Sequence, residues 1–245
     1  MTIRFNPELD TAALTAELAG RRRVQIRDVL VPEDAKHIYD VLARRTPWWL
    51  AYNDGDAVAQ VSPEQLAALN PADLGRILMG ISERARTQYQ FVYSYFPVIS
   101  SYFAQPRPDV AIFEVFEFLN SPATLEYFRK LTGQGDIQWV DAQPTLYRPG
   151  DFLKSHSDLD DAKVRVAAYV LNFTPAWERD WGGYLQFFNE SHDIVEALTP
   201  RFNAMNVFMV PTDHSVGIVA PFANGPRLSV TGWFRRDPPP GKIGG

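Results

Sequence analysis

Two hydrophobic patterns follow one another along the chain, and the change comes near residue 137. Upstream of that point, apolar residues recur mainly at the spacing of amphipathic helices, and a cap residue followed by proline marks several helix starts. A strand is expected at 24–30, and a hairpin about the Asp54-Gly55 turn. The predicted helices are 32–45, one from 63, one from 71 to about 86, 109–119 and 122–131, and the predicted hairpin strands are 48–53 and 57–61.

From about 137 the hydrophobic period becomes two, which is typical of strands. Clusters of Gly, Pro, Asn and Asp separate the runs, so we expect a mainly β fold, a sandwich or jelly-roll barrel, with α-helical elaboration. Residues 1–136 are expected to pack on a core of 137–236 as one structural unit, with a flexible tail at 237–245. The strand candidates are 137–147, 151–158, 163–172, 182–188, 193–198, 203–210, 215–220 and 227–234.

Some upstream segments allow two interpretations. Trp48 and Trp49 suit core packing, or the segment Trp48 to Val61 forms a flap beside a substrate groove. The aromatic run 89–103 suits a core or a groove, because so many aromatic side chains rarely stay exposed. Helical spacing favours packing for a further apolar set, Leu74, Ile77, Leu78 and Ile81.

Composition narrows the possible partners. The 245 residues are 46% hydrophobic and carry a net charge of −5 without a basic stripe, so we expect no direct nucleic-acid partner. With no cysteine, the strong metal ligands left are histidine and carboxylates. No apolar run has the length of a membrane span, and we expect a cytoplasmic protein without a membrane partner. The oligomeric state stays open.

The stretch Tyr147 to Asp158 ends with a possible metal site. His156 and Asp158 are two residues apart, so in an extended strand they leave the same face and can share one ion. The third ligand is His214, which follows an apolar strand, or His192, which lies in a polar cluster typical of a solvated turn. His214 is the better candidate. His37 has no obvious partner and is interpreted as a surface or packed helix residue.

The last strand candidate carries an unusual polar face. Arg227, Ser229 and Thr231 share one side by the period-two rule, although the strand is otherwise apolar. A buried arginine needs an anion, and its planar fork suits a carboxylate. The sequence therefore predicts a carboxylate-bearing ligand, with a structural salt bridge as the alternative.

These pieces together resemble one enzyme family. The chain is similar to the 2-oxoglutarate and iron(II)-dependent oxygenases of the prolyl 4-hydroxylase type, and within them to the Tpa-type proline hydroxylases that act on a ribosomal protein. The similarity covers about 137–236 and is weaker upstream. Position 170 is valine, where the hypoxia-factor hydroxylases carry a second tyrosine. The matching pieces are Tyr147 with P-G-D-F-L at 149–153, His156-x-Asp158, Y-V-L-N at 169–172, W-x-x-D-W-G-G-Y-L at 177–185, His214 and R-L-S-V-T-G-W at 227–233.

The resemblance implies a double-stranded β-helix core at 137–236 and a role for each matched residue. His156, Asp158 and His214 would hold iron(II) and form the catalytic centre. Arg227 would bind the distal carboxylate of 2-oxoglutarate. Tyr147 and Thr231 would be further residues of the 2-oxoglutarate pocket, and Ser229 lies on the same strand face as Thr231. Tyr169 and Trp233 are weaker candidates for the pocket wall.

The activity implied is hydroxylation of a prolyl residue in a protein or peptide, such as a ribosomal protein. It would be coupled to decarboxylation of 2-oxoglutarate to succinate, with dioxygen as the other small-molecule partner and L-ascorbate as a cofactor whose need the sequence leaves open. Two alternatives remain: a hydroxylase of a free amino acid or small metabolite, and a non-catalytic 2-oxoglutarate-binding module. A zinc hydrolase would have no use for the strand that carries Arg227.

Overall fold

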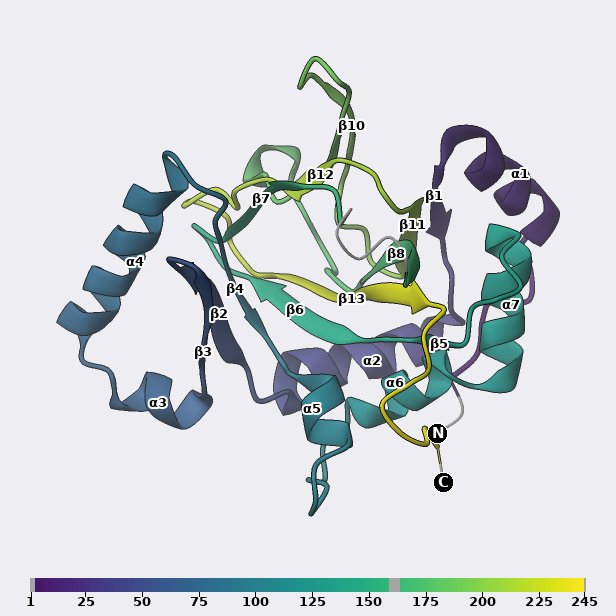
Figure 1. Ribbon diagram of the computed structural model, residues 1–245, viewed down its shortest axis with the longest axis horizontal. Helices are drawn as coiled ribbons and strands as arrows, with labels where there is room; N and C mark the ends of the chain where they lie inside the picture. The colour runs from purple at the N-terminus through teal and green to yellow at the C-terminus, as the bar shows by residue number, and fades with distance from the viewer. Residues whose placement is uncertain (1–2, 159–163, 245) are drawn as a thin grey trace.

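A single curved sheet forms the body of the protein (Figure 1). The computed structural model describes residues 3–158 and 164–244, and thirteen strands in these residues join into the sheet. The strands are β1 Arg23–Arg27, β2 Trp49–Asp54, β3 Ala57–Val61, β4 Phe91–Tyr95, β5 Trp139–Val140, β6 Gln143–Tyr147, β7 Phe152–His156, β8 Arg165–Asn172, β9 Leu185–Phe188, β10 Ile194–Leu198, β11 Ala204–Met209, β12 His214–Val216 and β13 Arg227–Arg235. The helices are α1 Thr11–Arg21, α2 Pro32–Arg45, α3 Pro63–Ala68, α4 Pro71–Ala85, α5 Val98–Tyr102, α6 Phe113–Leu119 and α7 Pro122–Thr132.

Most predicted elements are confirmed, and their ends follow the expected local chemistry. Ser62 and Gln65 form a capping box at the start of α3, and Asn70 caps α4. Gly55 turns the β2–β3 hairpin at φ +69°. Each of the eight downstream strand candidates overlaps at least one strand of the sheet. The first residue of the 163–172 candidate, Lys163, lies outside the described residues.

Two of the boundaries that differ from the expectation are described here. The helix predicted from 109 begins at Phe113, after an exposed Asp109 and a turn in which Ile112 is already buried. The strand predicted at 137–147 is split into β5 and β6. Asp141 and Ala142 interrupt it, and the Asp141 side chain accepts a hydrogen bond from the backbone of β13.

The two faces of the sheet have different coverings. In β8, Ala167, Tyr169 and Leu171 point into the large core shared with α2, α6 and α7, which lie on one side of the sheet in Figure 1. Ala168 and Val170 point the other way and pack against β9 and β11. The sheet thus folds over itself, and β7, β12, β9 and β10 form a second layer facing β8, β13 and β6. The candidate site lies between these layers.

Strands from the N-terminal half belong to the same sheet. β1 pairs with β11, and β4 bridges the layers by pairing with both β6 and β7. The hairpin β2–β3 joins the edge of β4. Trp48 and Trp49 are half-buried against the core, which favours the packing interpretation of these two tryptophans.

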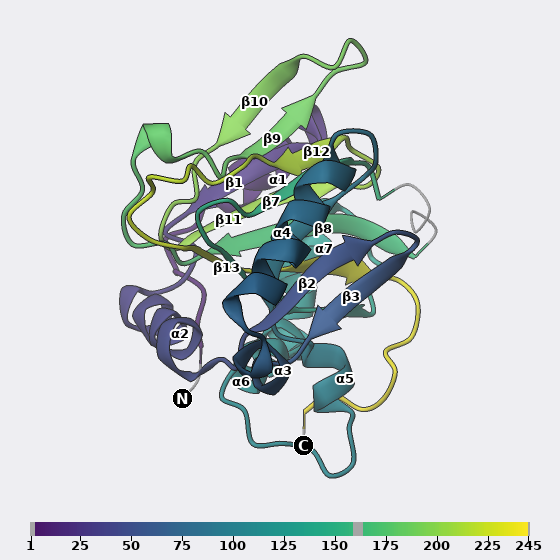
Figure 2. The ribbon, with the colours of Figure 1, turned by 90° about the vertical axis from the view of Figure 1, so that its left-hand side faces the viewer.

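The helix α4 stands at one end of the sheet beside β2 and β3 (Figure 2). Ile81 is buried, but Leu74 and Leu78 are 36% and 43% exposed, so the prediction that they pack is wrong. The end of α4 is tied to β7, because Lys154 Nζ donates to the carbonyls of Ala85 (2.8 Å) and Gln88 (2.6 Å). Among the described residues, no helix combines the length and apolar character of a membrane span.

Candidate metal centre

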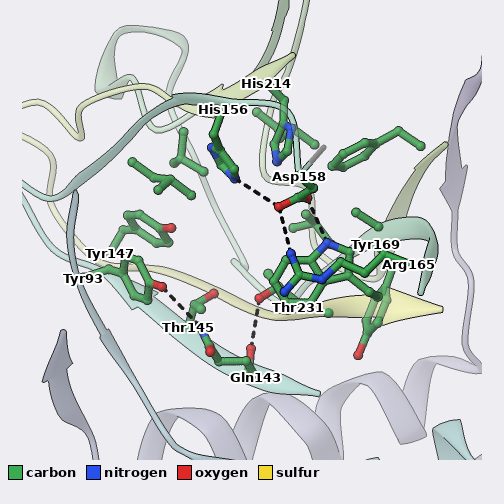
Figure 3. A pocket seen from close by; sticks show the side chains of 18 of the residues that line it. Tyr93, Gln143, Thr145, Tyr147, His156, Asp158, Arg165, Tyr169, His214 and Thr231 are labelled. Carbon is green, nitrogen blue, oxygen red and sulfur yellow. Dashed lines mark hydrogen bonds and ion pairs between the residues drawn. The ribbon is translucent and has the colours of Figure 1, made fainter. Parts of the chain in front are cut away.

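Three side chains with metal-binding atoms converge between the two layers, at His156, Asp158 and His214 (Figure 3). One ligand atom from each lies within 4.8 Å of the others. His156 and His214 are directly paired residues of the antiparallel strands β7 and β12, and their ring centroids are 4.2 Å apart. Asp158 follows β7 in a left-handed conformation, φ +57°, that aspartate tolerates better than most residues.

Both imidazoles are oriented by backbone carbonyls. His156 Nδ1 lies 3.0 Å from the carbonyl of Lys154, and His214 Nδ1 lies 2.8 Å from that of Thr212. A neutral ring that donates from Nδ1 keeps the Nε2 lone pair for a metal. Burial, with the neighbouring His156 ring as a second cause, lowers the pKa of His214 to about 4, so this imidazole is neutral at physiological pH.

The Asp158 carboxylate is held by two side chains on the opposite layer. Trp233 Nε1 donates to Oδ2 over 2.8 Å, and Arg165 Nη1 lies 3.2 Å from Oδ1. The Arg165 guanidinium is stacked over the Trp233 ring, 3.7 Å from its centroid. Trp233 therefore orients the carboxylate of the cluster. The sequence had predicted only that Trp233 would be a pocket residue.

Arg227 lies deeper in the same cavity, whose volume is about 270 Å³. Its side chain is 1% exposed, and its Nε and Nη1 atoms have no hydrogen-bond partner among the described residues. Tyr147, opposite it on β6, presents its ring 5.1 Å from the guanidinium carbon. Burial lowers the pKa of Arg227, yet a guanidinium stays protonated in proteins, so an anion is needed to compensate the charge.

Paired residues of β6 and β13 continue this polar face. Thr231 lies opposite Gln143, and its hydroxyl donates to the Gln143 carbonyl over 3.2 Å. Ser229 and Thr145 share a buried hydrogen bond of 2.8 Å. Among the described residues, Thr231 and Thr145 line the cavity whereas Ser229 does not, so Thr145 takes the place expected for Ser229.

Three further residues considered in the sequence analysis lie outside the candidate metal centre or at the border of its cavity. Tyr169 borders the cavity, but its ring stacks on Phe234 in the core and its hydroxyl donates to the Asp141 carbonyl over 2.8 Å. His192 is exposed in the β9–β10 connection. His37 lies in α2 with Nε2 2.6 Å from Glu114 Oε1, a partner that the sequence did not reveal.

Several wall residues were not predicted. Tyr93 stacks on Tyr147, with ring centroids 5.1 Å apart, and its hydroxyl accepts a hydrogen bond from the Gln143 side chain. Tyr89 lies at the rim with its ring centroid 5.8 Å from that of His156. Gln143 and Thr145 alternate with Tyr147 at the period of a strand, and this spacing could have identified them.

The polar face beside the three candidate metal ligands agrees with the comparisons of the sequence. Residues 142–235 match the model of the 2OG-Fe(II) oxygenase superfamily, and they contain all three candidate ligands and Arg227. Residues 142–235 are a 2OG-Fe(II) oxygenase domain. Iron(II) and 2-oxoglutarate are the cofactor and co-substrate of this family.

Two curated proteins are similar in sequence to part of this chain. Prolyl 3-hydroxylase OGFOD1 of Mus musculus is 31% identical over 111 residues, which cover 40% of this chain and 20% of that protein. Prolyl 3-hydroxylase sudestada1 of Drosophila melanogaster is 30% identical over 114 residues, 41% of this chain and 21% of that protein. The match thus spans about a fifth of the length of each relative.

Solved structures confirm the fold of the oxygenase domain and its N-terminal elements. A prolyl-4-hydroxylase of Pseudomonas putida aligns with a TM-score of 0.58 at 22% identity, covering 93% of this chain and 99% of that one. A prolyl hydroxylase of Trichoplax adhaerens, in complex with a hypoxia inducible factor peptide fragment, aligns with a TM-score of 0.56 at 13% identity, covering 92% and 89%. The double-stranded β-helix expected from the sequence is therefore confirmed.

The W-G-G motif of the oxygenase domain packs closely against Arg227 and the segment that follows β12. Gly182 and Gly183 both have positive φ, +65° and +64°. A Cβ on Gly182 would lie 2.2 Å from the Ile218 carbonyl oxygen, and one on Gly183 would lie 3.0 Å from the Trp177 ring and 3.6 Å from Arg227 Cδ. Only glycine lets this segment pass so close to Arg227 and to the chain that follows β12.

Proposed function

We propose that the chain is a 2-oxoglutarate and iron(II)-dependent dioxygenase that hydroxylates a prolyl residue in a protein or peptide. The observation that carries the proposal is the pairing, in one cavity, of a two-histidine, one-carboxylate cluster with a buried arginine for which the described residues offer no fixed anion. Such a cluster on one face of iron(II) is the arrangement of non-heme oxygenases. The names of the curated relatives support proline as the target.

The donor set fits iron(II). His156 and His214 each keep Nε2 for the metal because the carbonyls of Lys154 and Thr212 occupy Nδ1. Asp158 would supply a carboxylate oxygen while Trp233 and Arg165 fix its plane. Three protein ligands leave the remaining coordination positions for a bidentate co-substrate and dioxygen.

The buried end of the cavity fits a dicarboxylate. Arg227 would form an ion pair with the far carboxylate of 2-oxoglutarate, because its Nε and Nη1 atoms have no hydrogen-bond partner among the described residues. Burial raises the pKa of Tyr147 well above its usual value, so its hydroxyl stays protonated as a hydrogen-bond donor. Thr145 and Thr231 line the same cavity and offer further hydroxyl groups.

With iron(II), 2-oxoglutarate and dioxygen bound, the centre would supply the oxidising power for C–H hydroxylation, with succinate and carbon dioxide as co-products. The chain's own residues would orient the reactants and exclude water. Tyr93, Tyr147 and Leu153 form an apolar wall on one side, and Trp233 and Phe208 form another. The target proline would enter at the rim marked by Tyr89.

The proposal is tested by measuring succinate formation from 2-oxoglutarate with iron(II), with and without proline-containing peptides. His156→Ala and Asp158→Ala should each abolish turnover, because either change leaves too few ligands for iron. His192→Ala is the matched control and should keep wild-type turnover, since His192 lies outside the cluster. Full turnover in both ligand variants would refute the assignment of the metal ligands.

Mass spectrometry then identifies the substrate class. A gain of one oxygen on a prolyl residue, dependent on 2-oxoglutarate, supports the proposal. Oxidation of free proline or another small metabolite, without change in any peptide, would show a small-molecule hydroxylase. Tight 2-oxoglutarate binding without succinate formation would show a non-catalytic binding module.

A further inference from the structure

A second cavity, of about 350 Å³, lies next to the metal cavity and shares the residues Gln143 and Trp233 with it. The shared residues lie on β6 and β13, so one ligand that contacts both of them would lie beside both cavities. The remaining wall comes from β3, β4, α5 and the segment between β5 and β6: Gln60, Tyr95, Pro97, Val98, Ile99, Ser100, Asp141 and Ala142. We call this second cavity the flanking pocket.

The flanking pocket combines an apolar wall with one buried carboxylate. Pro97 and Ile99 are half-buried, and Asp141 is only 9% exposed. Asp141 Oδ1 accepts the Trp233 backbone N–H over 2.6 Å, and Oδ2 lies 3.5 Å from Arg235 Nη1. A carboxylate has more acceptor positions than these contacts use.

The charge of Asp141 is only partly compensated. Burial raises its pKa to about 6, although Trp233, Arg235 and Arg165 all act to lower it. The carboxyl group is therefore still ionised at neutral pH, in a place where ionisation is unfavourable. Among the described residues that line the flanking pocket, none is basic, since Arg235 approaches from outside it and Arg165 lines the metal cavity.

The hydroxyl of Tyr95 is a second polar group in the wall of the flanking pocket. Tyr95 is 5% exposed, and its hydroxyl has no hydrogen-bond partner among the described residues. Burial raises the pKa of Tyr95 to about 12, so the group stays a neutral phenol that can accept one hydrogen bond and donate another. A buried hydroxyl without a partner is unfavourable, and a polar ligand atom would relieve that cost.

We propose that the flanking pocket binds a lysine or arginine side chain that neighbours the target proline in the protein substrate. The aliphatic stem would pack on Pro97, Ile99 and the Trp233 ring, and the cationic end would reach Asp141. A purely apolar side chain would leave the carboxylate uncompensated, and an acidic one would be repelled by it. The inference rests on the proposed function, because it places the proline in the metal cavity.

The direct test uses a set of peptides that contain proline. In each peptide, one position on either side of the proline carries lysine or norleucine, and norleucine has the same aliphatic stem without the amine. Binding is measured by calorimetry with the complete chain loaded with zinc and 2-oxoglutarate, so that no turnover occurs. At one position, lysine should bind about tenfold more tightly than norleucine, as for a partly buried charge pair.

Variants of the chain then show whether the preferred lysine side chain binds in the flanking pocket. Asp141→Asn keeps an acceptor for the Trp233 N–H and removes the charge, so the lysine preference should disappear. Ser100 is exposed on α5 and lines the pocket, so Ser100→Lys places a competing cation there and Ser100→Glu adds an anion. The preference should fall in Ser100→Lys and rise in Ser100→Glu. Ser191→Lys, in the β9–β10 connection, is the control for an added surface charge.

The outcomes separate the two proposals. Proline hydroxylation without a lysine preference at any position overturns the flanking pocket and leaves the proposed function standing. A lysine preference unchanged by Asp141→Asn and by both Ser100 variants also overturns it, because the cation would then bind elsewhere. A preference that responds to these variants as expected, in a chain that hydroxylates no peptide, supports the flanking pocket and refutes the proposed function.

Discussion

The Trp233 indole donates a 2.8 Å hydrogen bond to the Asp158 carboxylate, across the gap between the two layers of the sheet. Trp233 belongs to β13, the strand of Arg227, whereas Asp158 follows β7. One strand thus carries the arginine that is proposed to bind an anion and also the indole that holds the carboxylate of the candidate metal cluster. The two halves of the site are therefore coupled through β13.

Replacement of Trp233 by phenylalanine should weaken metal binding without unfolding the chain. Phenylalanine keeps an aromatic face for Arg165 but loses the N–H that orients Asp158. Loss of such an outer contact typically lowers metal affinity by about 10- to 100-fold. Titration with Co(II), followed by its visible absorption, measures the change. Trp49→Phe is the control, and equal affinities in the two variants would contradict this role.

Arg227→Met should abolish 2-oxoglutarate binding and leave the ligand-free chain at least as stable as wild type. Methionine removes a buried charge that has no fixed anion in the described part of the chain, and the cost of burying that charge disappears with it. Calorimetry of 2-oxoglutarate binding and thermal unfolding give the two readouts. Arg227→Lys keeps the charge but not the planar fork, and it should bind 2-oxoglutarate about 100-fold more weakly.

Wild-type chain should gain about 2.7 kcal/mol of stability at a 2-oxoglutarate concentration 100 times the dissociation constant, and Arg227→Met should gain none. A marked loss of stability in ligand-free Arg227→Met would instead indicate a structural ion pair. That result would remove the main support for a dicarboxylate site.

Gly182→Ala should destabilise the chain by about 2–4 kcal/mol. Its φ of +65° disfavours any side chain, and the added Cβ would meet the Ile218 carbonyl oxygen at 2.2 Å. Gly75→Ala is the matched control, because Gly75 lies within α4 with nothing within 4 Å of an added Cβ. That change should stabilise by about 0.5–1 kcal/mol. Urea unfolding of both variants checks the contrast.

Asp151→Asn should raise stability at pH 8 and have little effect at pH 4. Burial raises the pKa of Asp151 to about 7, from 3.8 in the unfolded chain. The folded state then binds the proton more tightly, so stability is lost as pH rises from about 4 to 7. Asparagine keeps an acceptor for the Arg148 N–H and removes this loss, worth about 1–4 kcal/mol.

Urea unfolding at the two pH values measures the difference for Asp151→Asn. Asp56→Asn, in the exposed β2–β3 turn, controls for the loss of one negative charge. A gain for Asp151→Asn that is equal at pH 4 and pH 8 would show that the pKa of Asp151 is not raised in the folded chain.

The sequence predicted local elements well because their causes are local. Asp54-Gly55 sets a hairpin, Ser62 with Gln65 closes a capping box, and the period of two marks the face that carries Arg227. The closeness of His156 and Asp158 could be predicted for the same reason, since they are near neighbours in the chain.

Relations across long sequence separations were not predictable in this way. Periodicity does not say that β1 pairs with β11, nor that His214 lies directly opposite His156. Helical spacing marks Leu74 and Ile81 alike, although Ile81 has a neighbouring layer to pack on and Leu74 is exposed. The contacts of Trp233 and Asp141 needed the folded sheet, because each joins segments far apart in the sequence.

The direct pairing of His156 with His214 has a consequence for the unloaded protein. β12 is three residues long, and its ladder with β7 contains an irregularity, so few backbone hydrogen bonds hold these strands together. An ion bound by both rings would act as a reversible cross-link that closes the intervening segment into a loop and lowers the entropy of its open states. Iron supply would then set how often β7 and β12 separate, and with it the rate at which proteases cleave the protein.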